Sequence, residues 1–293
     1  MKNYKIILFA FLVLPFLVTA QKKVKDTIPE KPERPAFESS FIIDNPTNVL
    51  FVKNTLEITM SHRFGEINDY RGDLAGFWGS SNIRIGFSYA ILDQLTIGFG
   101  TTKDDRLQDF SLKGAILRQT RSNKIPVSIT YYGNMVINAS QRDNPRYDSP
   151  IPLKQHRYSY FHEIIIAKRF SSKFSLQIAP SLSHYNFVQP YMENDRFSIA
   201  FGGRYKVSPQ TALLLDYSQP ITQFDKDPDH PNTSYNYPGV SMGVEFVTSG
   251  HAFQLFITNL HGIVPQKNYI ENTNDFFNGD FMIGFNITRK YNF

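Results

Sequence analysis

Hydrophobic and polar side chains alternate along most of the chain beyond Thr55. The alternation is clearest in residues 281–293, where Phe281, Ile283, Phe285 and Ile287 are separated by small or polar residues. Successive side chains of a β-strand point to opposite faces, so this segment is predicted to be a strand with one apolar and one polar face.

Eleven further segments show the same period of two, which indicates half-buried strands. The sequence therefore predicts twelve strands, at residues 55–64, 82–91, 95–100, 110–119, 127–138, 157–170, 174–185, 196–207, 211–218, 239–248, 252–260 and 280–293.

The links between these strands alternate in length. Five are short (92–94, 121–126, 171–173, 208–210 and 249–251), and the others are mostly long and polar (65–81, 103–109, 139–156, 187–195, 219–238 and 261–279). Short turns at one end and long loops at the other are typical of a transmembrane barrel. We therefore predict an all-β fold, a transmembrane up-and-down antiparallel β-barrel at residues 55–293. Its outward face carries Ile83, Ile85, Phe87, Ile283, Phe285 and Ile287.

The N-terminal residues resemble an export signal. Lys2 and Lys5 precede an apolar stretch at residues 6–17, and small residues up to Ala20 offer a cleavage site. We expect a signal peptide at residues 1–20, then a periplasmic segment at 21–54. Its first part, to Ala36, is charged and rich in proline and predicts a disordered linker. For residues 37–54, a plug, a short helix or an extra strand all remain open.

The composition excludes several classes of protein. There is no cysteine, so a disulfide framework and a lipid-anchored N-terminus are excluded. The formal charge of +5 falls to +3 when the two lysines of residues 1–20 are removed, which is too small a surplus to indicate nucleic-acid binding.

An even number of strands places the first and last strand ends at the same rim of the barrel. Both chain termini are therefore expected to face the periplasm, in the outer membrane of a Gram-negative bacterium.

The polar face of the strands is predicted to line the lumen. Ten charged residues share this face: Glu57, Arg63, Arg84, Lys113, Glu163, Arg204, Lys206, Asp216, Glu245 and Lys290. Both signs are mixed, so two interpretations stand side by side. The charges either pair and fill a closed barrel, or line a polar pore.

Catalytic chemistry has little support in the sequence. The seven histidines show no metal-ligand spacing, and the acidic loop 225–230 lacks the pattern of a calcium loop. His62 and His184 lie near serines, but no nucleophile-elbow motif accompanies them. We therefore assign no catalytic, cofactor-binding or metal-binding residue and expect no enzyme.

Several short sequences in a fixed order resemble a family of Bacteroidetes proteins known as a β-barrel domain of unknown function, DUF5777. They are residues 37–40, 61–65, 82–86, 126–130, 183–186, 202–205 and 284–288 (FESS, SHRFG, NIRIG, PVSIT, SHYN, GGRY and GFNIT). They span the chain from residue 37 almost to its end. The resemblance implies an outer-membrane barrel and supplies no catalytic residue and no substrate.

Three functions follow as hypotheses, and the first is preferred because an exported barrel of this size without a catalytic signature has few other common uses. The first is a passive channel or transporter for small polar solutes, and the second is a closed structural barrel whose extracellular loops bind a partner. The third is a rim enzyme that acts on membrane lipid. Expected partners are outer-membrane lipid and the barrel assembly machinery, which would recognise the C-terminal strand ending in Phe293. The resemblance and the pattern leave the oligomeric state open.

Overall fold

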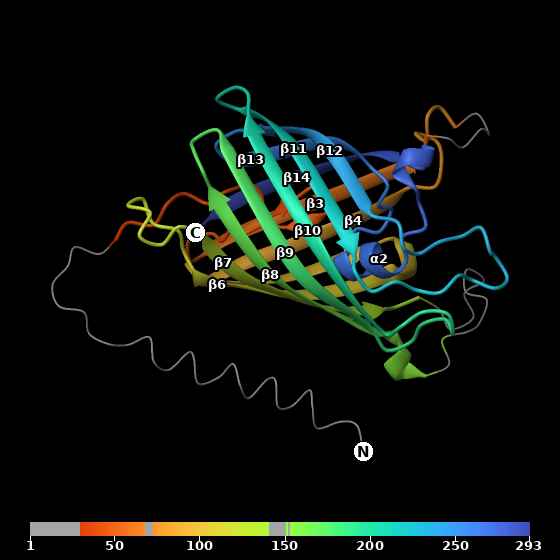
Figure 1. The fold of residues 1–293 in the computed structure, drawn as a ribbon. Coiled ribbons are helices and arrows are strands. Elements are labelled where there is room, and N and C mark those ends of the chain that lie inside the picture. Colours follow the sequence, from red (N-terminus) through yellow and green to blue (C-terminus); the bar gives the residue numbers. More distant parts are fainter. Residues whose placement is uncertain (1–29, 68–72, 141–150, 152) are drawn as a thin grey trace, which may run out of the picture. The chain divides into compact units, whose positions relative to one another are not determined.

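Twelve antiparallel strands close into one barrel in the computed structural model of the chain (Figure 1). The structure describes residues 30–67, 73–140, 151 and 153–293. The predicted signal peptide and most of the predicted linker lie outside these residues. Statements below concern the compact unit Pro32–Phe293.

Each barrel strand pairs with its neighbour in sequence, and β14 pairs with β3 to close the barrel. The strands are β3 (Thr55–Glu66), β4 (Asn82–Leu92), β5 (Leu95–Thr102), β6 (Leu107–Leu117), β7 (Ser128–Asn138), β8 (Tyr158–Arg169), β9 (Phe174–Tyr185), β10 (Asp195–Lys206), β11 (Thr211–Pro220), β12 (Gly239–Val247), β13 (His251–Thr258) and β14 (Met282–Asn292).

The alternation predicted from the sequence is present in the structure. Along β4, Ile85 and Phe87 are each 41% exposed, whereas Asn82 and Ala90 are fully buried. Large hydrophobic side chains are exposed in the same way on most other strands, such as Leu213 and Leu255. A broad apolar outer surface of this kind marks a membrane contact rather than a water-facing sheet. The predicted twelve-stranded transmembrane barrel is thus confirmed.

One prediction about the links is wrong. The link between β5 and β6 contains only residues 103–106, whereas that between β6 and β7 is the longer one, at 118–127. Residues 103–109 were predicted to be one of the long polar links, and the next strand to begin at about Phe110. In the structure Asp109 is a strand residue whose side chain points inward and is 1% exposed.

Smaller elements occupy the barrel and its links. Strands β1 (Phe41–Ile42) and β2 (Asn45–Pro46) form a separate two-stranded sheet. One short helix, α2 (Pro265–Ile270), lies in the link between β13 and β14 (Figure 1). Three single 3-10 turns, η2 (Asp104–Arg106), η3 (Lys154–Arg157) and η4 (Phe276–Asn278), lie in links at the same end of the barrel as α2. No helix in the described ranges is long and apolar enough to cross a membrane.

Candidate functional site: the lumen and the plug hairpin

Residues 36–51, here called the plug hairpin, lie inside the barrel. Phe37, Ile42, Ile43 and Val49 are each at most 4% exposed and belong to one cluster with inward side chains of the wall. The hairpin turns between β1 and β2, where Ile43 has a positive φ of 54°. Of the alternatives left open for residues 37–54, the structure has a plug with two very short strands.

The tip of the plug hairpin carries a buried carboxylate. Asp44 forms an ion pair with Arg63 of β3, whose Nη2 is 2.8 Å from Oδ1, and both side chains are 1% exposed. The hydroxyls of Ser241 and Thr258 donate to the other oxygen of Asp44 at 2.7 and 3.0 Å. Each charge is therefore compensated, which a charge buried away from water requires.

A second wall residue, Asp216 of β11, binds the backbone of the turn between β1 and β2. Its carboxylate accepts hydrogen bonds from the backbone amides of Asp44 and Asn45 at 3.0 and 3.1 Å. The side chain of Asn45 donates to it as well, at 2.6 Å. Asp216 thus satisfies the backbone donors of a turn that has no sheet partner in the wall.

Four more of the ten predicted lumen residues contact the plug hairpin. The hydroxyls of Ser39 and Ser40 donate to Glu245 and Glu57 at 2.9 and 2.6 Å. Lys113 and Lys290 donate to the backbone carbonyls of residues 40 and 38 at 2.8 and 3.1 Å. Together with Arg63 and Asp216, six of the ten residues bind the hairpin directly.

The other four lie elsewhere in the lumen. Arg204 of β10 forms an ion pair with Glu245 of β12 at 2.8 Å. Arg84 of β4 forms an ion pair with Asp109 of β6 at 2.7 Å. Glu163 is buried, and neither of its carboxylate oxygens has a hydrogen-bond partner within the described residues. Lys206 is partly exposed near a short turn. Two of these four residues, Arg84 and Arg204, therefore form ion pairs with other residues of the wall.

One inner glycine makes room for such a pair. A Cβ at Gly100 would overlap both the Arg84 guanidinium and the Asp109 carboxylate. Asp109 is not among the ten charged residues predicted to line the lumen, so this ion pair was not predicted.

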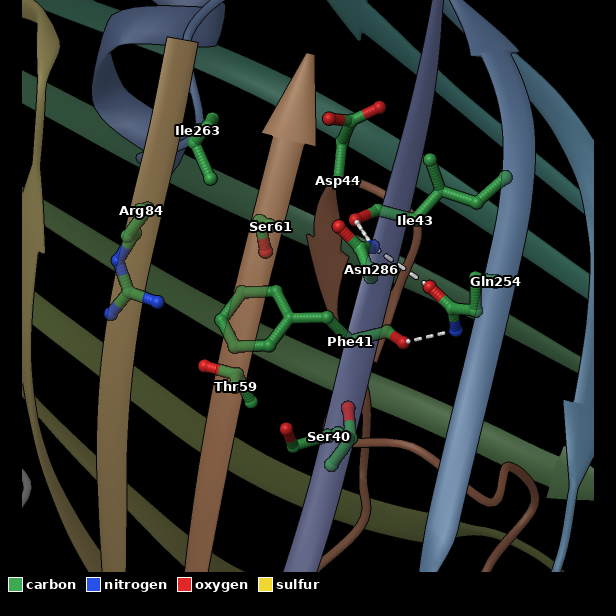
Figure 2. Close-up of a pocket in the computed structure, with 11 residues that line it drawn as sticks. Ser40, Phe41, Ile43, Asp44, Thr59, Ser61, Arg84, Gln254, Ile263 and Asn286 are labelled. Carbon is green, nitrogen blue, oxygen red and sulfur yellow. Dashed lines mark hydrogen bonds between the residues drawn. The ribbon is translucent and has the colours of Figure 1, made fainter.

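Amide side chains of the wall also bind the plug hairpin. The prediction of lumen residues rested on charged side chains, so it did not include these amides. Gln177, Gln254 and Asn286 donate to the carbonyls of Pro46, Phe41 and Ile43 at 2.8, 3.0 and 2.9 Å. Figure 2 shows the last two, with the amide of Asn286 also joined to Gln254. Irregular backbone within a membrane protein needs such partners, because lipid offers none.

A second segment blocks the lumen at the long-loop end. The hydroxyl of Tyr269 in α2 donates to Asn45 at the hairpin tip at 2.7 Å, and its ring stacks on Phe161 of β8 at 5.6 Å. Gln266 reaches Asn134 of β7 at 2.9 Å, and Arg196 of β10 holds the carbonyl of Tyr269 at 2.6 Å. The helix and the plug hairpin therefore meet inside the barrel.

Little space remains between the plug hairpin and the wall. Two cavities there have volumes of about 20 Å³ each, and the first is drawn in Figure 2 between Phe41, Thr59 and Arg84. A cavity of this size holds about one water molecule. A cavity of about 400 Å³ lies at the long-loop end, lined in part by α2. No group of three or more histidine or acidic residues in the described part of the chain is arranged to hold a metal ion.

A family model described as a membrane bound beta barrel domain, DUF5777, matches residues 37–291. This match covers both the barrel and the plug hairpin. No curated protein matches the sequence significantly.

Several solved structures of outer membrane proteins are similar to this chain at low identity. An outer membrane channel from Pseudomonas putida F1 is 13% identical, with 83% of this chain and 97% of that chain covered and a TM-score of 0.47. The KdgM porin is 6% identical, with 82% and 99% covered and a TM-score of 0.45. LpxR from Salmonella typhimurium is 10% identical, with 82% and 100% covered and a TM-score of 0.38. At such identities and TM-scores, the activities of those proteins are not transferred to this chain.

Proposed function

The chain belongs to the DUF5777 family of membrane-bound β-barrel domains, and from that premise we propose a closed outer-membrane barrel that acts through its long loops. The supporting observation is the plug hairpin, which binds six of the ten charged lumen residues. A passive channel needs an unblocked path, and this hairpin occupies it.

An outer-membrane location is supported by three features. The N-terminal residues resemble an export signal, the outer surface of the barrel is apolar, and the family is membrane-bound. Both ends of the barrel, at Thr55 and Asn292, pair with each other at the short-turn end. In the proposed orientation this end faces the periplasm, and the assembly machinery recognises β14 and Phe293.

Gated passage of small polar solutes is the second candidate function. It is favoured by the contacts between the plug hairpin and the wall. Many of these contacts are hydrogen bonds and an ion pair with polar side chains of the wall, which water can replace when the hairpin leaves. The chain enters the barrel at the short-turn rim, where the Glu33 amide donates to the Gln119 carbonyl at 2.7 Å and Arg169 donates to the Pro35 carbonyl at 3.5 Å. Passage would require this segment to withdraw towards the short-turn end.

The rim enzyme has the least support. The two ring nitrogens of His184 contact Asp195 and Asn186 at 2.7 and 3.1 Å, so neither is directed at a serine. His62 stacks on Phe285 at 5.1 Å. Neither arrangement activates a nucleophile.

Wild-type protein inserted in planar bilayers is expected to remain electrically silent, because the plug hairpin and α2 leave no continuous aqueous path. Insertion and folding are verified separately, from the heat-modifiable mobility of protein recovered from the same membranes. Regular conductance steps from the folded wild-type protein, seen in repeated insertions, would reject the closed barrel in favour of the channel.

A further inference from the structure

The cavity of about 400 Å³ at the long-loop end has the size of a small-molecule site. Its floor includes Leu107 and Val136 from β6 and β7, together with Lys267 and Ile270 of α2. Tyr269 of the same helix contacts the plug hairpin. The cavity therefore lies in the long-loop mouth of the barrel, with α2 as part of its lining.

Charged side chains of both signs line this cavity, and its two cations already have partners. Lys267 pairs with Asp105 and with Glu271, the latter at 3.3 Å. Arg157 donates to the carbonyls of Asn138 and Ser140 at 2.8 and 2.7 Å. Among the described lining residues, three carboxylates (Asp105, Asp227 and Glu271) outnumber these two cations, so the lining does not favour an anionic ligand. This arrangement favours a neutral one.

Asp227 is a buried carboxylate of this cavity that already accepts several hydrogen bonds. It is 7% exposed and accepts hydrogen bonds from the Asp229 amide, the Tyr191 hydroxyl and His230 at 2.9, 3.1 and 3.1 Å. Burial acts to raise the pKa of the Asp227 carboxyl, but these donors hold it below its ordinary value. The group is thus ionised at neutral pH, and the donors of Asp229, Tyr191 and His230 satisfy its oxygens.

Flat rings dominate the rest of the lining. Seven ring-bearing side chains line the cavity: His156, Tyr158, Tyr185, Phe187, Tyr191, His230 and Tyr235. The rings of His156 and Phe187 are stacked at 4.9 Å, and those of Tyr191 and Tyr235 lie 5.8 Å apart. Tyrosine offers an apolar ring face and a hydroxyl at the same place.

We propose that this cavity binds a neutral saccharide of about one or two rings, a size that suits its volume. A sugar ring has a face of C–H groups that packs on aromatic rings, and a rim of hydroxyls that donate and accept hydrogen bonds. The tyrosine hydroxyls and Gln189 supply the partners for that rim. A purely apolar ligand would bury these groups without hydrogen bonds, which is unfavourable. This proposal assigns a class of ligand to the long loops through which the barrel is proposed to act, and it therefore rests on the proposed function.

Saturation-transfer NMR on the purified, folded full chain in detergent tests this directly, with glucose, maltose, cellobiose and lactose as probes. At least one sugar is expected to receive saturation. Phe187→Ala should weaken its binding about tenfold, the upper value for loss of one ring contact. Tyr191→Phe keeps the ring and removes the hydroxyl, so it should weaken binding by a smaller factor without disturbing the fold.

Phe277→Ala is the matched control, because this phenylalanine is 81% exposed and does not line the cavity. It should leave sugar binding unchanged. Absence of transfer to all four sugars, equal binding by Phe187→Ala, or binding of naphthalene in their place would overturn the proposal. The bilayer measurement is independent of this result, so failure of the saccharide site and failure of the closed barrel are distinguished.

Discussion

Removal of both blocking segments is expected to convert an electrically silent barrel into one that conducts ions in discrete steps. The variant lacks residues 37–48 and carries a glycine-serine linker in place of 262–272. Both segments lie in the lumen, and their contact through Asn45 and Tyr269 joins them there. The wall strands retain all of their pairing, so the barrel itself is expected to persist. Recordings in planar bilayers measure the ion conductance, and heat-modifiable gel mobility measures whether the barrel is folded.

Each single removal should conduct less than the double one, because the other segment still narrows the path. Replacement of residues 225–233 by a linker of equal length is the control. These residues belong to the link between β11 and β12, outside the lumen, so this variant should remain silent. A double variant that is folded, inserted and still silent would contradict the account of the blocked lumen.

Replacement of Asp44 by alanine is expected to release the plug hairpin. The change leaves Arg63 buried without its partner, at a cost of about 3–5 kcal/mol, or roughly two to three and a half orders of magnitude in the docking equilibrium. It also removes the acceptor of Ser241 and Thr258. Hydrogen exchange of residues 39–46 should therefore accelerate by about that factor, whereas exchange in β5 and β8 should not change.

Asp229→Ala is the matched control, because Asp229 is an exposed aspartate in a long link. Its exchange pattern should equal that of the wild type. Unchanged protection of residues 39–46 in the Asp44→Ala protein would show that the ion pair does not hold the hairpin.

The barrel could be predicted from the sequence because one physical constraint acts on every strand. Residues that face lipid must be apolar and those that face inward can be polar, so the period of two survives in nearly every strand. The exception is instructive. Asp109 was assigned to a loop, although an inward aspartate beside a glycine has room to pair with Arg84.

The plug hairpin obeys no such constraint. Its residues are surrounded by wall on all sides, so Ile42 and Ile43 contact the apolar cluster while Asp44 and Asn45 meet charges. A segment of this kind has no period, which is why residues 37–54 matched three alternatives equally. The parity of the strands predicted which charges face inward. It could not predict their partners, since the backbone of the hairpin supplies many of them.

The position of the plug hairpin in the membrane-embedded protein can be measured with a pair of cysteines. The natural chain has none, so Ser40→Cys and Thr59→Cys introduce the only two thiols. Both residues line the same two small cavities, and Figure 2 shows them on the hairpin and on β3. A short bifunctional maleimide should join them in high yield within intact membranes, whereas the pair Ser40→Cys and Ser249→Cys, at a distant exposed turn, should not react together. If the thiols at positions 40 and 59 are labelled separately and never joined, the hairpin lies outside the lumen and the account fails.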